Sequence, residues 1–221
     1  MKEQKNKLNE KVITISRSEL FRGREFSGVR NKGPYLQRIK RMAKLTTRAE
    51  AEESSELKQP IPYAVLINEE DKIYYYIRSR KGYSESRLAE KGSIGVGGHI
   101  EEKDLRGKDF IREALLRELR EEVKARVKSI RHIGYINRED TPVSRVHFGL
   151  LHLARISGSA TSKNREIKSG EMLTLKELEA KQMEEWSAEA LKAIKKAIKI
   201  KRKRQNHTEK RGCRSGQTGQ A

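Results

Sequence analysis

A glycine turn followed by an acidic amphipathic helix, within residues 97–123, constrains the fold of this chain more than any other stretch. Apolar residues recur at every fourth position and predict the buried ridge of one helix: Ile111, Leu115, Leu119 and Val123. Glu118, Glu121 and Glu122 follow the i, i+3, i+4 spacing, so their carboxylates share one helix face. A hard divalent cation relieves the repulsion between such carboxylates because it prefers oxygen ligands. The helix therefore predicts a metal site, with a solvated acidic face as the plainer alternative.

The residues before this helix favour a close approach of the backbone to a ligand. A short strand ends at Gly97 and Gly98, and glycine permits both a sharp turn and close contact. The start of the helix then offers unpaired N–H groups and the positive end of its dipole, which suit an anion. We expect Gly97, Gly98 and His99 to border a substrate pocket, although an ordinary turn is the alternative for His99.

These residues resemble the Nudix box of the Nudix hydrolases. The family pattern reads glycine, five residues, Glu, seven residues and then Arg-Glu-apolar-any-Glu-Glu-any-Gly-apolar; Gly98 and residues 117–122 match it. Eight residues before Arg117, where the family has Glu, this chain has Asp109, which also suits a helix cap. Because the interval between Gly98 and Asp109 is five residues longer than the pattern, we expect an insertion over residues 103–107.

The resemblance extends beyond the box to about residues 60–180 and implies an α-β-α sandwich. Residues 93–102, with residues 85–88 before them, resemble a bacterial subgroup of predicted phosphoesterases in the same superfamily. Lys124 replaces the glycine that follows the paired glutamates, so the helix is expected to run on past the box.

The hydrophobic patterns agree with an α/β fold that has a mixed sheet between helices. Strands are expected over residues 12–15, 61–68, 72–78, 129–136, 145–156 and 166–173. Helices are expected after Ser18, within residues 35–45, after Thr174 with Glu177 in a capping box, and after Ser187. The polar residues 79–91 predict a loop, and residues 157–162 predict a flexible linker.

Strand periodicity places some neighbouring side chains on opposite faces of the sheet. Tyr75 is expected to face away from Tyr74 and Tyr76. His147 and His152 lie on opposite faces of one strand, so they cannot together form a metal pair. Each is expected to be a hydrogen-bonded histidine of the sheet.

The net charge of +19 is concentrated towards the C-terminus. Residues 57–190 carry 25 basic and 22 acidic side chains, whereas residues 191–221 carry 11 and 1. We divide the chain into an N-terminal extension (1–56), a Nudix domain with a C-terminal helix (57–203) and a disordered basic tail (204–221). The tail suits RNA or another polyanion, or simply solubility, and it has no aromatic residue on which a base would stack.

The chain has the features of a cytoplasmic protein without a membrane segment. Its one cysteine, Cys213, cannot form a disulfide within the chain, which fits a reducing compartment. The N-terminal residues are too polar for a signal peptide, and no apolar run approaches the length of a membrane span.

The resemblance implies a Mg²⁺-dependent hydrolase that cleaves the diphosphate bond of a nucleoside diphosphate linked to another moiety. Glu118, Glu121 and Glu122 are expected to hold Mg²⁺, with Mn²⁺ as an alternative. Glu118, Glu121 and Arg117 form the expected catalytic set, in which Arg117 orients a glutamate of the box.

The general base and the extent of catalysis stay open at the level of the sequence. The base is either a glutamate of the box or one that arrives later in the chain, Glu166 or Glu171. The alternative function is an RNA- or nucleotide-binding module with little or no catalysis. A third possibility is a domain that keeps the fold only for interaction, which the retained carboxylates disfavour.

Overall fold

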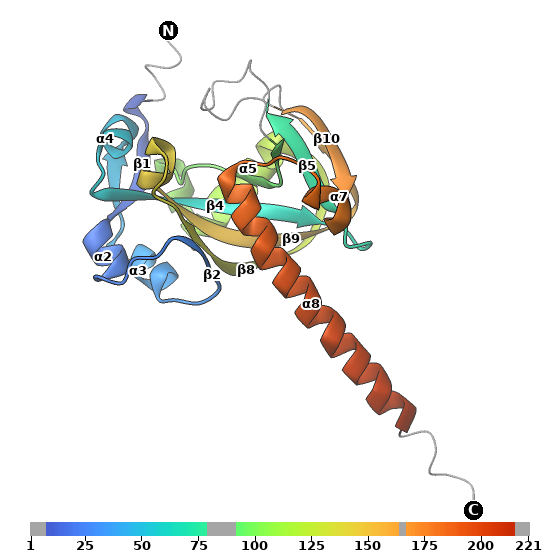
Figure 1. The fold of residues 1–221 in the computed structure, drawn as a ribbon. Coiled ribbons are helices and arrows are strands. Elements are labelled where there is room, and N and C mark those ends of the chain that lie inside the picture. The colour runs from blue at the N-terminus through green and yellow to red at the C-terminus, as the bar shows by residue number, and fades with distance from the viewer. Residues whose placement is uncertain (1–7, 79–91, 164–166, 215–221) are drawn as a thin grey trace, which may run out of the picture.

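The fold is a mixed sheet flanked by helices, as Figure 1 shows. The computed structural model describes residues 8–78, 92–163 and 167–214. Within them, the strands are β1 (Lys11–Ser16), β2 (Gly28–Arg30), β3 (Lys44–Thr47), β4 (Leu57–Ile67), β5 (Ile73–Arg78), β6 (Gly92–Ser93), β7 (Gly95–Gly97), β8 (Val123–Asn137), β9 (His147–Ser162) and β10 (Ile167–Leu173). The helices are α2 (Arg17–Phe21), α3 (Tyr35–Met42), α4 (Arg48–Glu53), the 3-10 helix η2 (Glu102–Arg106), α5 (Phe110–Glu122), α6 (Pro142–Val146), α7 (Leu175–Glu179) and α8 (Glu185–Arg214).

The order of the main strands is β10-β5-β4-β9-β8-β2. Strands β4 and β9 run parallel, whereas the other neighbours in this order are antiparallel. The short strand β7 pairs with β4 and leads the chain into the glycine turn. This arrangement confirms the predicted α/β architecture with a mixed sheet.

The alternation of side chains along β4 builds a separate core on each face of the sheet. Ala64 and Leu66 pack with the helix α5, through Leu115 and Leu119. The intervening residues of β4 pack with α7 and α8 on the other face: Tyr63, Val65 and Ile67. The tyrosines of β5 divide as expected, since Tyr74 and Tyr76 belong to the first core and Tyr75 to the second.

The N-terminal extension packs onto the same face of the sheet as α5. Strand β1 pairs with β3 and with the beginning of β4. Phe21 of α2 contacts Phe148 of β9 edge to face, with ring centroids 5.8 Å apart. Ile39 of α3 is fully buried in the same cluster, together with Ile111 of α5. The extension is therefore part of the core that supports the box helix.

Helix α5 ends at Glu122, so the prediction that it continues past Lys124 is wrong. Val123 is already extended (φ −131, ψ 147), and Val123 and Lys124 pair with the end of β9. The side chain of Val123 is buried in the core beside Leu119, and its β-branched shape favours a strand. The box thus leads directly into β8.

The small residues 157–162 continue strand β9 and do not form a linker. They pair with residues 123–126 of β8, where the register shifts between Lys124 and Arg126. Gly158 accommodates a positive φ of 70° at this irregular point. Backbone pairing with β8 therefore holds these residues in a strand, although their composition suggested a flexible linker.

Several predicted boundaries move by a few residues because other side chains act as caps. Ser16, rather than Ser18, caps α2 by accepting a hydrogen bond from the Glu19 amide (3.3 Å). Residues 142–146 form α6, with Pro142 at its first turn and Thr141 as its cap, so β9 begins at His147 instead of residue 145. Helix α3 ends at Met42, and residues 44–47 form β3.

The C-terminal helix is longer than the sequence suggested. Helix α8 begins at Glu185, and Ser187 is buried in its first turn, where its hydroxyl accepts a hydrogen bond from the Ile94 amide (3.0 Å). The helix then continues to Arg214, whereas we expected no regular structure beyond residue 203. Figure 1 shows α8 crossing one face of the sheet and projecting beyond it.

Other local predictions hold. Asp109 caps α5 through the Arg112 amide, and Thr174 and Glu177 form the capping box of α7. The predicted loop over residues 79–91, which includes residues 85–88, lies outside the described residues. In the part of the chain that the structure describes, no helix combines the length and apolar character needed to cross a membrane.

Candidate functional site

The carboxylates of the box differ in their exposure to solvent. Leu115 and Leu119 anchor α5 in the core, which turns the other face of the helix outwards. The side chain of Glu118 is 12% exposed and that of Glu121 is 55% exposed. Glu122 is half-buried. Burial of Tyr74 and the negative charge of Glu122 both raise the pKa of Tyr74, so the Glu122 carboxylate lies near β5. The helix therefore presents one deep, one half-buried and one exposed carboxylate.

The glycine loop, residues 97–100, lies directly on Glu118. A Cβ atom on Gly98 would collide with the Glu118 carboxylate, and one on Gly97 would collide with the Pro62 carbonyl. At Gly97 the obstacle is backbone, so only glycine fits there, whereas at Gly98 the end of the Glu118 side chain would have to move. The structure thus brings the Gly98 backbone against Glu118.

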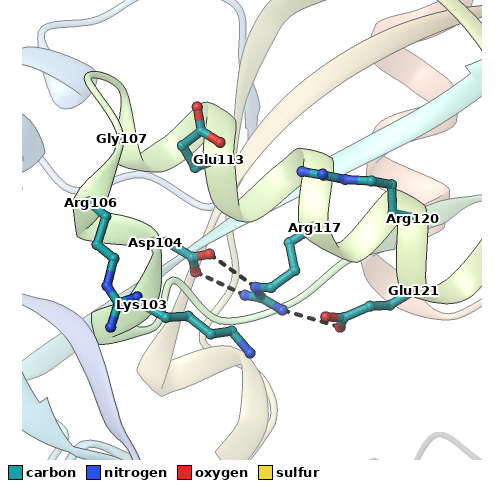
Figure 2. A pocket seen from close by; sticks show the side chains of 8 residues that line it. All are labelled: Lys103, Asp104, Arg106, Gly107, Glu113, Arg117, Arg120 and Glu121. Atoms are coloured by element: carbon teal, nitrogen blue, oxygen red, sulfur yellow. Dashed lines mark hydrogen bonds and ion pairs between the residues drawn. The ribbon is translucent and has the colours of Figure 1, made fainter.

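Arg117 connects the glycine loop, the box and η2. Its guanidinium donates to both carboxylate oxygens of Asp104 (3.0 and 2.9 Å) and to the carbonyl of His99 (2.9 Å). It also donates to Glu118 (2.6 Å) and to Glu121 (3.4 Å). Figure 2 shows Arg117 between Asp104 and Glu121. This paired, two-pronged geometry fixes the orientation of the guanidinium.

Burial and neighbouring charges shift the pKa values of Arg117 and Glu118. Burial opposes the charge on Arg117, but its partners Asp104 and Glu118 outweigh burial and raise the pKa of the guanidinium. Burial also raises the pKa of the Glu118 carboxyl, and the positive charge of Arg117 only partly opposes that shift. A bound cation would favour the ionised form of Glu118.

Asp104, and not Asp109, is the acidic partner of Arg117. Asp104 lies six residues after Gly98, which is the spacing of the family pattern, and its side chain is only 4% exposed. Asp109 is 42% exposed and pairs with Lys40 (3.0 Å). The five extra residues therefore lie between Asp104 and Arg117, rather than over residues 103–107. Counting forward from Gly98 would have identified Asp104 from the sequence.

A shallow pocket of about 430 Å³ lies beside this cluster, on the outer side of α5 and η2. Figure 2 shows its lining: Lys103, Asp104, Arg106, Gly107, Glu113, Arg117, Arg120 and Glu121. It contains Arg117 and Glu121 of the expected site, whereas Glu118 and the glycine loop are not among the lining residues. Its mixture of basic and acidic side chains is open to solvent.

The structure places Glu171, one of the two late glutamates, on the other face of the sheet from the box. Glu171 pairs with Tyr75 across β10 and β5, so both side chains point to the face covered by α7 and α8. Its carboxylate lies 3.3 Å from the amine of Lys181. The box helix packs on the opposite face, which disfavours Glu171 as the general base. Glu166 lies outside the described residues.

The side chain of His99 turns away from the box. Its Nε2 lies 3.2 Å from Nε2 of His147 and 3.7 Å from a carboxylate oxygen of Glu52. The sequence correctly separated His147 from His152, but it did not associate His147 with these partners. Glu52 belongs to the N-terminal extension, and nothing in its local sequence signals that it meets the glycine loop.

Known proteins resemble this chain in sequence and in fold. The family model of the NUDIX domain matches residues 58–194. Protein YmaB of Bacillus subtilis (strain 168) is 31% identical over 202 residues, which cover 82% of this chain and 95% of YmaB.

Solved structures extend the comparison to the fold. Tm1382, assigned to the Nudix hydrolases, superposes with a TM-score of 0.72 at 28% identity, over 84% of this chain and 98% of Tm1382. The NUDIX domain of Shewanella oneidensis NrtR, in complex with ADP-ribose, matches with a TM-score of 0.52 at 14% identity, over 64% and 88% of the two chains. The NrtR match shows a common fold alone. Because the family model spans more than half of the sequence, this chain belongs to the NUDIX domain family, whose general chemistry is hydrolysis of a pyrophosphate bond.

Proposed function

We propose that this protein is a Mg²⁺-dependent pyrophosphohydrolase that cleaves a nucleoside diphosphate linked to another moiety. The observation that carries the proposal is the contact of the Gly98 backbone with Glu118, on a helix face that also presents Glu121 and Glu122. A phosphate group can approach a backbone that has no side chain. Carboxylates beneath it are the ligands that a hard cation prefers.

The donor set fits Mg²⁺ and also accepts Mn²⁺. In our proposal, Glu118, Glu121 and Glu122 hold the metal through oxygen atoms. When bound, such an ion neutralises the diphosphate and lowers the pKa of a water molecule. Burial raises the pKa of the Glu118 carboxyl, and a cation bound beside it would favour the ionised form, which agrees with this assignment.

Arg117 is a positioning residue in this proposal. Its short contact with Glu118 (2.6 Å) fixes one oxygen of that carboxylate, and Asp104 fixes the guanidinium in turn. The catalytic set is then Glu118 and Glu121, with Arg117 acting through them. We place the general base among the box glutamates, because Glu171 lies on the other face of the sheet.

The test is phosphate release, coupled to a phosphatase, from a panel of nucleoside diphosphate derivatives. ADP-ribose, the ligand of the NrtR domain, is a sensible first compound because it is a nucleoside diphosphate linked to a sugar. We expect turnover that requires Mg²⁺, stops with a chelator and is lost in Glu122→Gln. Glu179→Gln is the matched control, since this glutamate of α7 pairs only with solvent-exposed Lys195 in the described contacts. Equal rates in the two variants would refute the assignment of the box.

A second function, polyanion binding, is favoured by the charge of the C-terminal end. Residues 191–221 carry 11 basic side chains and 1 acidic one, and α8 projects beyond the sheet. RNA affinity should then fall steeply with salt, and deletion of residues 200–221 should reduce that dependence. Equal RNA affinity without residues 200–221 would remove this function from the tail.

A further inference from the structure

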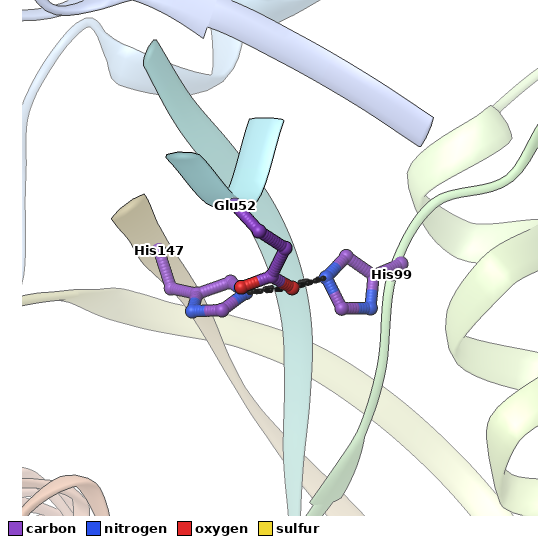
Figure 3. A group of neighbouring side chains, drawn as sticks. All are labelled: Glu52, His99 and His147. Atoms are coloured by element: carbon purple, nitrogen blue, oxygen red, sulfur yellow. Dashed lines mark hydrogen bonds and ion pairs between the residues drawn. The ribbon is translucent and has the colours of Figure 1, made fainter. Parts of the chain in front are cut away.

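Three ligand-type side chains from distant segments meet on the far side of the glycine loop. Glu52 comes from α4, His99 from the glycine loop and His147 from the first residue of β9. Figure 3 shows the carboxylate of Glu52 between the two imidazole rings. One ligand atom from each residue lies within 4.8 Å of the other two, and none of the three residues is fully exposed.

The distances between these atoms suit one metal ion. The two Nε2 atoms are 3.2 Å apart, and the same oxygen of Glu52 lies 3.7 Å from His99 and 3.9 Å from His147. A triangle with these sides has a point about 2.1 Å from each corner, which matches the usual zinc–nitrogen and zinc–oxygen distances. That point lies in the plane of the three atoms, so a four-coordinate ion would also draw the three side chains slightly closer together.

The hydrogen bond on the other side of His147 defines its protonation. Its Nδ1 lies 2.7 Å from the Val143 carbonyl, which can only accept, so Nδ1 carries a proton. Its Nε2 therefore presents a lone pair towards Glu52 and His99, in the orientation that metal-binding histidines commonly adopt.

We propose that Glu52, His99 and His147 form a site for a divalent transition-metal ion such as Zn²⁺, distinct from the carboxylates of the box. Two imidazole nitrogens and one carboxylate are the protein ligands of many zinc sites that keep one position for water. Nitrogen ligands favour such ions over Mg²⁺, so the two sites select different metals.

The competing arrangement is a metal-free hydrogen-bonded cluster. In it, His99 donates a proton from Nε2 to His147, and Glu52 is held by Arg48, whose Nε lies 3.6 Å from the same oxygen. The two arrangements differ in one measurable property, namely whether the chain binds a nitrogen-preferring metal at these residues.

The proposed site gives the N-terminal extension a defined role. Glu52 belongs to that extension, and the carbonyl of His99 accepts a hydrogen bond from Arg117 (2.9 Å). Metal binding would thus tie α4 to the loop that lies over the box. Binding to the native state alone also stabilises the fold, so the melting temperature should rise with added metal.

The test measures metal binding by the full chain after treatment with a chelator. Zn²⁺ affinity is obtained by competition with a chromophoric chelator, and Co²⁺ absorption reports the ligand geometry. Excess Mg²⁺ is present to occupy the box. We compare His147→Gln and Glu52→Gln with His152→Gln, because His152 is also buried and its ring contacts His132 at the same 5.2 Å centroid separation.

We expect the wild type to bind one Zn²⁺ with a tetrahedral Co²⁺ spectrum, and His147→Gln to weaken Zn²⁺ binding by on the order of 100-fold or more. Glu52→Gln tests the same site by a milder change at a half-buried position, and it should weaken binding by at least about tenfold. His152→Gln and Glu122→Gln should retain the Zn²⁺ site, and circular dichroism confirms that each variant is folded. Wild-type affinity in both His147→Gln and Glu52→Gln, or no Zn²⁺ binding by the folded wild type, would overturn the proposal.

Discussion

The two sides of the glycine loop use different chemistry. On the box side, Arg117 and Glu118 contact the loop, and the site is built from carboxylates and a guanidinium. On the other side, His99 meets Glu52 and His147, and imidazole nitrogens predominate. One loop residue serves both sides, since the His99 carbonyl binds Arg117 while its ring faces the histidine cluster.

The two sides also differ in how far apart their residues lie in the sequence. Residues 98–122 supply the whole box side, so a local pattern can reveal it. The histidine side is assembled from three segments that only the tertiary fold brings together. Substitutions on the box side should therefore reduce catalysis, whereas substitutions on the histidine side should weaken transition-metal binding.

The largest expected effect is on catalysis at the box. Glu118→Gln preserves the shape of the side chain but removes the charge that we assign to metal binding. We expect kcat/KM to fall on the order of 100- to 1,000-fold, as for other losses of transition-state electrostatics. The rate of phosphate release at saturating Mg²⁺ measures this, with Glu179→Gln as the control. A decrease below about threefold would mean that the box side does not depend on this carboxylate.

The next effect concerns the ion pair that holds Arg117. Asp104→Asn removes a nearly buried partner, and we expect the free energy of unfolding to fall by about 3 kcal/mol. Asp109→Asn is the matched control. It removes only an exposed ion pair with Lys40 and keeps a good capping residue, so its cost should stay below about 1 kcal/mol.

Urea denaturation at neutral pH measures both values. Similar losses in the two variants would contradict the assignment of Asp104 as the anchor of the loop.

Acid sensitivity gives a smaller effect and sharpens the comparison of the histidines. Burial lowers the pKa of His132 and of His152 to about 4, from an ordinary 6.5. The unfolded chain therefore binds more protons between these values, so stability is complete above pH 6.5 and falls as pH decreases towards 4. Over this window, wild type should lose about 2 kcal/mol more than His152→Gln.

Denaturant titrations at pH 7 and pH 4.5 measure that difference. Parallel losses in wild type and His152→Gln would show that this pair is not held neutral by burial.

The smallest effect should come from the contact between the loop and Glu118. In Gly98→Ala, the added Cβ would collide with the end of the Glu118 side chain, which can rotate away. We expect about a tenfold decrease in kcat/KM, because 1.4 kcal/mol of misplacement suffices for that factor. The unfolding free energy should change little. A large loss of stability with unchanged activity would show that this contact supports the fold and not catalysis.

Local signals in the sequence account for the box helix and for many of the strands. The four-residue recurrence from Ile111 to Val123 predicts the buried face of α5, and Asp109 predicts its start. The end of α5 depends on pairing between Val123 and Ser162 at the end of β9. That long-range contact also converts the small residues 157–162 into a strand, which composition alone could not indicate.

The parts of the site that escaped prediction depend on tertiary contacts or on the choice of alignment. Asp104 was available from its spacing to Gly98, but the insertion placed nearby concealed it. Glu52 lies in a polar helix with no chemical signature of its own. The face on which Glu171 lies could not be predicted, because alternation within β10 does not reveal which face of the sheet carries α5.

The central claim is that the carboxylates of α5 hold a hard divalent ion, and Mn²⁺ binding followed by electron paramagnetic resonance tests it most directly. The measurement needs no knowledge of the substrate, and Zn²⁺ added beforehand occupies the histidine side. We predict that wild type and Glu179→Gln bind Mn²⁺ alike, whereas the double variant Glu118→Gln, Glu122→Gln binds it at least about tenfold more weakly. Unchanged Mn²⁺ affinity in the folded double variant would contradict the claim.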